Sequence, residues 1–496
     1  MVLPDKPVGP VRTRDLRAWV GSLPALATGL CGSLLVAAGG LFMGRLAATP
    51  GARALVVLQS GPDARDTGYV LVFSGLALLT VAWLGLGLRV REAPDGVRPV
   101  WVATGLWAAP LMLTPPLFSN DVWSYVAEGQ LVAQGHSPYV YTPLDLSGPI
   151  VRAVGGTWDN VHAPYGPLPL IWGGAVSHLS ANPWVGLLGF RLLALLGLLA
   201  VAACVPRIAR AAGRDPASAT WLVVASPFTL VHGIAGAHLD LAIAGLLCFA
   251  LLRALRGGWV TAALLVGAAT AIKVPAVLAD AAVILASLPH VSTGLAGVRA
   301  RVARAIEVLA LSAATVLGLG AVSGLGTGWI GGLTTPLSHH SPLSPATELG
   351  LRAGPLLGLH LVTPTHVLAA AMLLLVTAYV VLRSPSETPG DAVRAAAVVM
   401  TATVLLSPVV HYWYFLWCLP FLASAVLSRR FRRWALVLTL TLGLLAPVDM
   451  SAHHLPYSGR IMLVGLGIAF LTVLDARDLG RMLGRGRAMA RAFGRS

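Results

Sequence analysis

Apolar residues run along this chain in long stretches, and short polar joints separate one stretch from the next. The first stretch, residues 22–46, is long enough to cross a bilayer, because a spanning helix needs about 20 mostly apolar residues. Polar and apolar residues do not alternate within the stretches, as they would in the strands of a membrane barrel. Backbone groups in lipid need partners within the chain, and helices provide them. The pattern therefore predicts an all-α fold, a polytopic transmembrane helical bundle with about 12–14 spans.

Composition agrees with this prediction. Of the 496 residues, 56% are hydrophobic and 11% are charged, whereas a soluble domain has about 25% charged residues. No internal repeat or linker divides the chain, so we expect a single integral membrane domain over residues 1–496. The four cysteines lie inside apolar stretches and lack metal-site spacing, which indicates inert, buried thiols.

The placement of arginine predicts the orientation. The net charge is +15, and such a charge often marks a nucleic-acid partner. Here the arginines occupy alternate joints, which the positive-inside rule explains, so we expect no nucleic-acid partner. The rule places both termini in the cytoplasm of a multi-pass plasma-membrane protein. The basic tail, residues 476–496, is then expected on the inner leaflet, where anionic membrane lipids would hold it.

The joints that face outward under this rule hold most of the histidines. The largest of them, residues 117–167, is expected to be the first large extracytoplasmic loop and to carry catalytic residues. Since arginine alone sets the orientation, the clustering of histidine is a separate indication that any chemistry takes place on the outer side.

Two acidic residues stand in that loop, Asp121 and Glu128. They are seven residues apart and therefore share one face of a helix. An acidic residue just outside a span suits a general base that faces a sugar at the membrane interface. Alternatively, Asp121 only favours the helix N-terminus electrostatically. Position alone leaves both interpretations of Asp121 open.

The same loop continues through turns rich in Pro and Gly that carry Tyr139, His162 and Tyr165. The two tyrosines offer rings and hydroxyl groups of the kind that line sugar sites. They would equally suit a structured turn with tyrosines at the membrane interface. We keep all three residues as candidates for substrate binding.

Four further candidates lie at the outer ends of later stretches. His238 and Asp240 could bind a hydroxylated substrate or one metal ion, although an HxD pattern alone is weak evidence for metal. Lys273 is the only lysine after Lys6, and a phosphate group of a lipid-linked substrate would explain it. Snorkelling of Lys273 to the interface is the alternative. His411 begins an aromatic run that could anchor the chain in the membrane or touch the substrate.

Arg460 closes the outer face near the last expected span. A guanidinium group matches the geometry of a phosphate well, which makes Arg460 a second candidate for binding phosphate.

The motifs together resemble a known family, the actinobacterial alpha-1,6-mannosyltransferases that use polyprenyl-phosphate mannose. The resemblance is carried by Ser-Asn-Asp-Val-Trp-Ser-Tyr at 119–125, Gly-His-Ser-Pro-Tyr at 135–139, Tyr-Gly-Pro at 165–167, His-Leu-Asp at 238–240, Ile-Lys-Val-Pro at 272–275 and His-Tyr-Trp-Tyr at 411–414. These enzymes belong to the GT-C class of membrane glycosyltransferases. The resemblance implies transfer of mannose from a polyprenyl-phosphate donor to a lipid-anchored alpha-1,6-mannan, as in lipomannan and lipoarabinomannan assembly.

The resemblance also implies a mechanism. Asp121 lies where such enzymes place the acidic residue of their first catalytic loop, and it would take the proton of the acceptor hydroxyl in one inverting displacement. Lys273 or Arg460 would neutralise the departing polyprenyl phosphate. The donor is already activated, so no cofactor is expected and no metal ion is strictly required.

A lipid-linked sugar transporter or flippase is the competing class, and a related envelope glycosyltransferase that uses a different sugar is another alternative. Transporters bind substrate near the bilayer midplane, often between internal repeats. Here the polar residues gather at one outer rim and no repeat is present, which favours the transferase.

Overall fold

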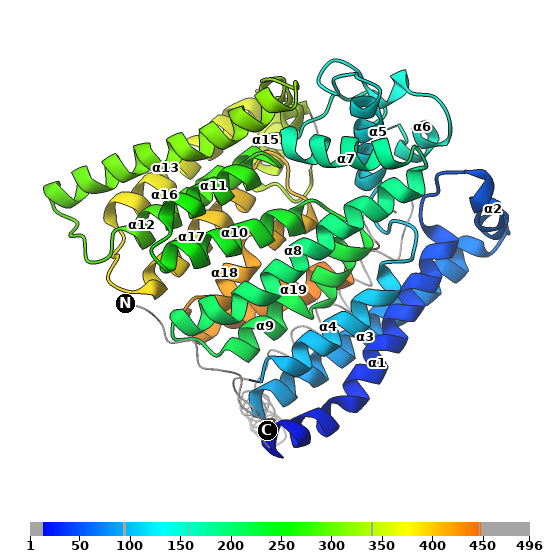
Figure 1. The fold of residues 1–496 in the computed structure, drawn as a ribbon, viewed down its shortest axis with the longest axis horizontal. Coiled ribbons are helices and arrows are strands. Elements are labelled where there is room, and N and C mark those ends of the chain that lie inside the picture. The colour runs from blue at the N-terminus through cyan, green and yellow to red at the C-terminus, as the bar shows by residue number, and fades with distance from the viewer. Residues whose placement is uncertain (1–12, 93–95, 157, 339–340, 446, 448–496) are drawn as a thin grey trace, which may run out of the picture.

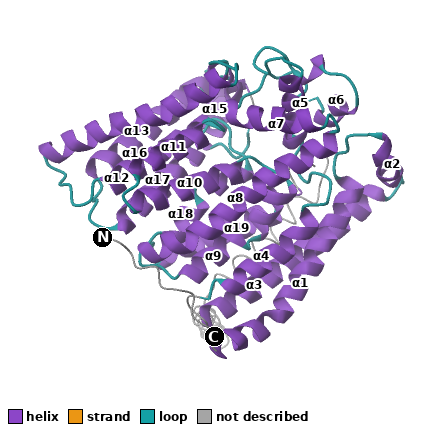
Figure 2. Ribbon diagram, in the orientation of Figure 1, coloured by secondary structure: helices purple, strands orange, loops and turns teal. Residues whose placement is uncertain are grey.

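The computed structural model describes residues 13–92, 96–156, 158–338, 341–445 and 447. Within these residues every regular element is a helix and no strand occurs, which confirms the all-α prediction (Figure 2). Arg460 and the basic tail at 476–496 lie outside the described residues.

The N-terminal part forms one side of the molecule (Figure 1). It consists of α1 (Thr13–Met43), α2 (Arg53–Gln59), α3 (Ala64–Glu92) and α4 (Arg98–Leu111). α1 packs along both α3 and α4. Trp83 of α3 stacks on Trp221, with ring centroids 4.6 Å apart. Each indole nitrogen donates a hydrogen bond to the other residue's carbonyl oxygen, at 3.0 and 2.7 Å, and this reciprocal pair joins α3 to the central helices.

The segment after α4, which holds the predicted first large loop at residues 117–167, folds into helices of its own. It contains α5 (Asp121–Ala133), the short 3₁₀ helix η2 (Pro143–Asp145) and α6 (Pro149–Val154), and α7 (Pro167–Leu179) begins at its end. α5 packs against α6, α7 and the following helix α8 (Pro183–Ala211). Both acidic candidates in α5 are therefore buried, with Asp121 7% and Glu128 2% exposed.

The central part follows α8. It contains α9 (Pro216–Val224), the π-helical segment η3 (Thr229–Ala235), α10 (Asp240–Leu255), α11 (Trp259–Thr270), the 3₁₀ helix η4 (Val274–Ala279) and α12 (Asp280–Ser287). α10 packs on both α8 and α11. The start of α10 is thus held between neighbouring helices.

The C-terminal part completes the bundle, with α13 and α16 along the side opposite α1 (Figure 1). Its elements are α13 (Leu295–Val322), α14 (Trp329–Gly332), η5 (Thr335–Ser338), α15 (Pro345–Leu357), α16 (Val362–Arg383), α17 (Pro389–Leu405), η6 (Tyr412–Trp417), α18 (Leu419–Ser424) and α19 (Arg429–Leu444).

Fewer long apolar helices are present than the sequence pattern predicts. In the described part, five helices are long and apolar enough to span a membrane, or six if α9 and η3 form one bent span, whereas the pattern predicts about 12–14 spans. Proline at 227, 275 and 420 accompanies breaks in the apolar stretches, because it removes a helical hydrogen bond. Shorter helices result, such as α11 with 12 residues. The five long helices still agree with a polytopic membrane protein.

Close contact between α8 and α10 depends on glycine. A Cβ atom added at Gly197 of α8 would lie 2.4 Å from the carbonyl oxygen of Leu241 in the first turn of α10. We expect Gly197→Ala to lower the free energy of unfolding by about 1–3 kcal/mol, the usual cost of overpacking. Gly105→Ala is the control, since nothing lies within 4 Å of a Cβ atom added at that position in α4. Alanine at position 105 should raise the free energy of unfolding by roughly 0.5–1 kcal/mol. Equal effects of the two substitutions on unfolding in detergent would contradict this account.

Glu128 makes stability depend on pH. Burial raises the pKa of Glu128 from 4.5 to about 8, a hydrogen bond from Ser124 opposes the rise, and the negative charge of Asp121 adds to it. The unfolded chain releases this proton above its ordinary pKa while the folded chain keeps it, so stability falls as pH rises through this window. We expect a loss of roughly 2–3 kcal/mol in unfolding free energy between pH 6 and pH 8. Glu128→Gln should remove most of that slope, and an unchanged slope in the variant would assign it to other groups.

Candidate functional site

The candidate residues gather where helices begin or break. Asp121 is the first residue of α5, Asp240 is the first residue of α10, Lys273 precedes η4 and His411 precedes η6. Side chains at helix ends can point into a shared space, whereas side chains within packed helices are committed to neighbouring helices. The breaks therefore bring residues from four distant parts of the chain into one cluster.

Two turns that lead into this cluster have strained backbones. Phe118, before α5, has a φ of 66°, and Ala237, next to His238, has a φ of 52°. Left-handed conformations at residues other than glycine cost of order 1–3 kcal/mol and occur mostly at functional sites. The strain lies beside Asp121 and His238, the two residues that make the closest contact between α5 and the turn before α10.

Asp121 is a buried carboxylate in contact with two polar side chains. Its Oδ2 atom lies 3.5 Å from Nδ1 of His238, and it accepts a hydrogen bond of 3.4 Å from the hydroxyl group of Tyr125. Burial alone would raise the pKa of Asp121, but His238, His411 and Lys273 outweigh that effect and hold the pKa below its usual value. Asp121 is therefore ionised at neutral pH and can accept a proton.

An aromatic stack supports His238 from one side. The imidazole of His238 stacks on Trp413, with ring centroids 3.7 Å apart and planes 13° apart. His411 also stacks on Trp413, at 4.6 Å and 3°. Both ring nitrogens of His238 are buried and neither makes a hydrogen bond within the described part of the chain, although Nδ1 lies 3.5 Å from Asp121. Nε2 is thus a buried polar atom whose hydrogen-bonding capacity is unused there.

Lys273 forms an ion pair with the fully buried Asp240. Its Nζ atom donates to both carboxylate oxygens of Asp240, at 3.0 and 3.1 Å. The ammonium group also lies over the ring of Tyr414, 4.7 Å from the centroid, and 5.6 Å from the centroid of Tyr165. With its side chain only 11% exposed, Lys273 does not extend to an interface as a snorkelling lysine would. Asp240 holds the cation inside the protein beside Asp121.

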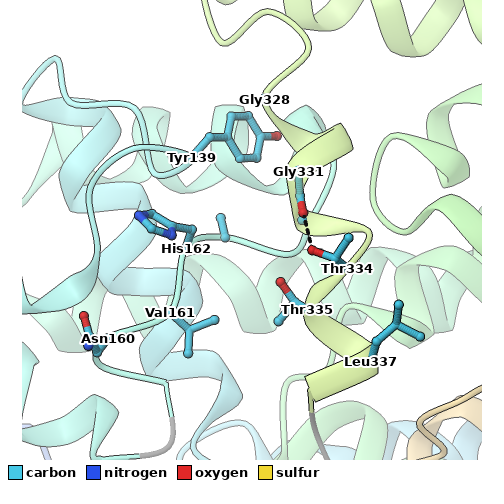
Figure 3. Close-up of a pocket in the computed structure, with 11 residues that line it drawn as sticks. Tyr139, Asn160, Val161, His162, Gly328, Gly331, Thr334, Thr335 and Leu337 are labelled. Atoms are coloured by element: carbon cyan, nitrogen blue, oxygen red, sulfur yellow. Dashed lines mark hydrogen bonds between the residues drawn. The ribbon is translucent and has the colours of Figure 1, made fainter. Parts of the chain in front are cut away.

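A cavity of about 650 Å³ opens next to this cluster (Figure 3). Tyr139, Asn160 and His162 of the loop at 117–167 form one wall, and α14 and η5, with Thr334 between them, form the other. Among the described residues that line the cavity none is charged, and hydroxyl, amide and imidazole groups supply its polar surface.

Tyr165 links the cavity to the charged cluster. The hydroxyl group of Tyr139 donates a hydrogen bond of 3.0 Å to the carbonyl oxygen of Tyr165. The ring of Tyr165 meets Lys273 and packs edge-on against Tyr125, whose hydroxyl group reaches Asp121. Contacts through Tyr139 and Tyr165 thus connect the cavity with the ionised residues.

The structure places most of the residues predicted from the sequence close together. Asp121, Tyr165, His238, Asp240, Lys273 and His411 lie in the cluster. Glu128 lies deeper in α5, where Ser124 donates a hydrogen bond of 3.3 Å to it. Tyr139 and His162 line the cavity instead, and Nε2 of His162 lies 3.1 Å from the carbonyl oxygen of Val140. Within the described residues, no group of three or more His, Cys, Asp or Glu side chains is arranged to hold a metal ion.

Sequence reasoning missed Arg191. This residue of α8 is 1% exposed and donates hydrogen bonds to the carbonyl oxygens of Met112 and Ala235, at 2.8 and 3.2 Å. It ties the end of α4 to the end of η3, directly before the turns that lead to Asp121 and His238. The sequence held a signal, since Arg191 is the only charged residue in the first 24 residues of a long apolar helix.

Comparison with known proteins identifies the family of this chain. A family model described as "Alpha-(1->6)-mannopyranosyltransferase, N-terminal domain" matches residues 26–289, and one described as "MptB C-terminal domain" matches residues 345–475. No solved structure matches the chain.

Three relatives show how far the similarity extends. An alpha-(1->6)-mannopyranosyltransferase of Mycobacterium tuberculosis is 30% identical over 84% of this chain and 81% of its own length. Alpha-(1->6)-mannopyranosyltransferase B of Corynebacterium glutamicum is 29% identical, over 77% and 68% of the two chains. With alpha-(1->6)-mannopyranosyltransferase A of Mycobacterium tuberculosis, 32% identical, the match covers 42% of this chain and 41% of the relative. The chain belongs to the alpha-(1->6)-mannopyranosyltransferase family.

Proposed function

We propose that this protein transfers mannose from polyprenyl-phosphate mannose to a lipid-anchored alpha-1,6-mannan on the outer side of the plasma membrane. One observation carries the proposal: the buried carboxylate of Asp121 shares a cluster with a lysine ammonium group that Asp240 holds among aromatic rings. Glycosyl transfer from a phosphate donor needs such a pair, a base for the acceptor hydroxyl and a cation for the leaving phosphate. Family membership supports mannose as the sugar.

Asp121 is the base in this mechanism. The acceptor oxygen attacks the anomeric carbon while its proton passes to the carboxylate, and the bond from that carbon to the phosphate oxygen breaks with inversion. A depressed pKa keeps Asp121 ionised until the acceptor arrives. Nδ1 of His238, 3.5 Å away, helps to hold the carboxylate in place.

The charges balance over this step. Apart from the imidazoles, Asp121, Asp240 and Lys273 carry one net negative charge, which would oppose a second negative charge on the departing phosphate. Proton transfer to Asp121 removes one negative charge at the moment when the phosphate gains one. Lys273 then faces the leaving group with Asp240 as its only ionised partner among these three residues. The residues present therefore supply a route that needs neither a cofactor nor a metal ion.

The neutral cavity is where we place the acceptor glycan. A mannan carries hydroxyl groups and no charge, and the polar groups of the cavity are matched to it: the Asn160 amide, the His162 imidazole and the Thr334 hydroxyl (Figure 3). Tyr165 contacts both Tyr139, which lines the cavity, and Lys273. A glycan bound in the cavity would therefore have one end close to Asp121. The polyprenyl chain of the donor would remain in lipid.

Asp121→Asn tests the catalytic role. The substitution keeps the size of the side chain and removes the base, so we expect turnover to fall roughly 100- to 10,000-fold. The assay measures transfer from radiolabelled polyprenyl-phosphate mannose in membranes that contain equal amounts of each variant. Glu128→Gln is the matched control, because Glu128 lies in the same helix as Asp121. A neutral glutamic acid and a glutamine are also similar in size and charge.

The outcomes separate the alternatives. Normal turnover by Asp121→Asn with loss in Glu128→Gln would make Glu128 the base. Normal turnover by both would move the chemistry to His238 and Asp240. No transfer of any sugar by the unaltered protein would favour a lipid-linked sugar transporter.

The role of Lys273 is tested with a double variant that also replaces Asp240. Replacing Lys273 alone leaves the buried Asp240 without a partner, which is strongly destabilising. In the double variant Lys273→Met with Asp240→Asn no isolated charge remains, so the protein should fold. We expect turnover of the donor to fall by about 100-fold or more, since the cation stabilises the phosphate most in the transition state. Unaltered donor turnover by a well-folded double variant would exclude the ion pair from the mechanism and leave Arg460 as the phosphate ligand.

A further inference from the structure

A second cavity, of about 420 Å³, lies far from the candidate site. Residues of the connection between α8 and α9, of α9 itself and of the first turns of α19 line this cavity. Figure 1 shows α9 at the end of α8 opposite α5 and α7. From Arg191, near the candidate site, α8 continues for 20 residues to Ala211, a rise of about 30 Å. That rise matches the thickness of the hydrocarbon core, about 30 Å, so α8 is long enough to place this cavity and the candidate site at opposite faces of a membrane.

Positive charge converges on this cavity. Arg214, Arg432 and Arg433 line it, and Asp215 is the only acidic residue among its lining residues. One oxygen of Asp215 accepts a hydrogen bond of 2.7 Å from the backbone nitrogen of Ser218, as the cap of α9. Among the described residues that line the cavity, three guanidinium groups thus stand against one carboxylate.

Arg214 is held in an unfavourable position. Burial lowers the pKa of its guanidinium group, the charge of Arg432 lowers it further, and Asp215 acts in the opposite direction. Its Nε atom is buried and has no hydrogen-bond partner in the described part of the chain. An arginine that only marks the cytoplasmic side would extend into water, where its charge is solvated.

Two helix N-termini add to the positive electrostatic potential at this cavity. α9 begins at Pro216 and α19 begins at Arg429, and residues from the first turn of each line the cavity. A helix N-terminus carries a partial positive charge, which favours anions. Asp215 and Ser428 cap these two ends, and each side chain accepts a hydrogen bond from one backbone N–H group. The remaining wall is apolar, with Trp221, Leu222 and Leu436.

We propose that this cavity binds the headgroup phosphate of an anionic phospholipid in the leaflet opposite the candidate site. The arginines match the phosphate, which guanidinium groups bind through paired hydrogen bonds. The apolar wall matches the glycerol and the first acyl carbons of a lipid, whereas a free phosphate ion would gain nothing from it. Depth in the membrane agrees, because a cavity about 30 Å along α8 from the candidate site lies at headgroup level.

The test measures lipid binding by the purified full-length protein in a neutral detergent. Native mass spectrometry would compare phosphatidylglycerol with phosphatidylcholine, and a separate titration would use inorganic phosphate. We expect phosphatidylglycerol to bind at least about ten-fold more tightly than phosphatidylcholine, and Arg214→Gln and Arg432→Gln each to weaken it about ten-fold. Arg430→Gln is the control, an exposed arginine of the same helix turn that does not line the cavity.

Arg432 is exposed, so its variant should fold even if Arg214→Gln does not. Phosphatidylglycerol should raise the thermal midpoint of the unaltered protein more than that of Arg432→Gln, because a ligand stabilises the folded state that binds it. Equal weakening by Arg430→Gln, or no preference between the lipids, would overturn the proposal by reducing the site to general surface charge. Binding of inorganic phosphate without binding of phosphatidylglycerol would overturn the assignment to a lipid.

Discussion

The guanidinium group of Arg191 is the interaction on which the candidate site depends. A helix that breaks inside a membrane protein leaves carbonyl groups without partners, and such groups are costly where no water can reach them. Arg191 supplies donors to the freed carbonyl oxygens of Met112 and Ala235, at the ends of α4 and η3. The chain can therefore end two helices side by side in the interior. The strained turns at Phe118 and Ala237 follow, and they deliver Asp121 and His238 to the same place.

Burial gives these residues properties that the same side chains would lack in water. Coulomb interactions are stronger in an interior of low dielectric, so the cations near Asp121 outweigh the burial that would otherwise protonate it. Glu128 lies deeper in the same helix without a cation, and burial keeps it neutral. Two carboxyl groups seven residues apart on α5 thus have opposite charge states, and only Asp121 can serve as a base at neutral pH.

The sequence predicted the class of fold and most members of the cluster, and it did so for physical reasons. Long apolar stretches require helices in lipid, and a lone Lys273 or an isolated Asp240 in such a stretch requires a partner. The pattern did not predict which partner. Lys273 and Asp240 are 33 residues apart and meet only because η4 and α10 begin at the same depth. The sequence pattern also did not predict the helix breaks near prolines, because an apolar stretch has the same composition whether its helix continues or ends. The number of long helices was therefore the least predictable feature.

The neutral cavity and the charged cluster were likewise inseparable in sequence, because Tyr139, His162 and Tyr165 belong to one loop of similar composition. In the folded chain these three residues belong to different environments, because their side chains point in different directions. Tyr165 turns its ring to Lys273, while its backbone oxygen accepts the hydrogen bond from Tyr139, which faces the cavity. A charged donor group and an uncharged glycan have opposite requirements, since a phosphate needs cations and a sugar needs neutral hydrogen-bonding groups. The fold thus places a neutral hydrogen-bonding surface beside a charged cluster, with Tyr165 in contact with residues of both, as the proposed acceptor and donor would require.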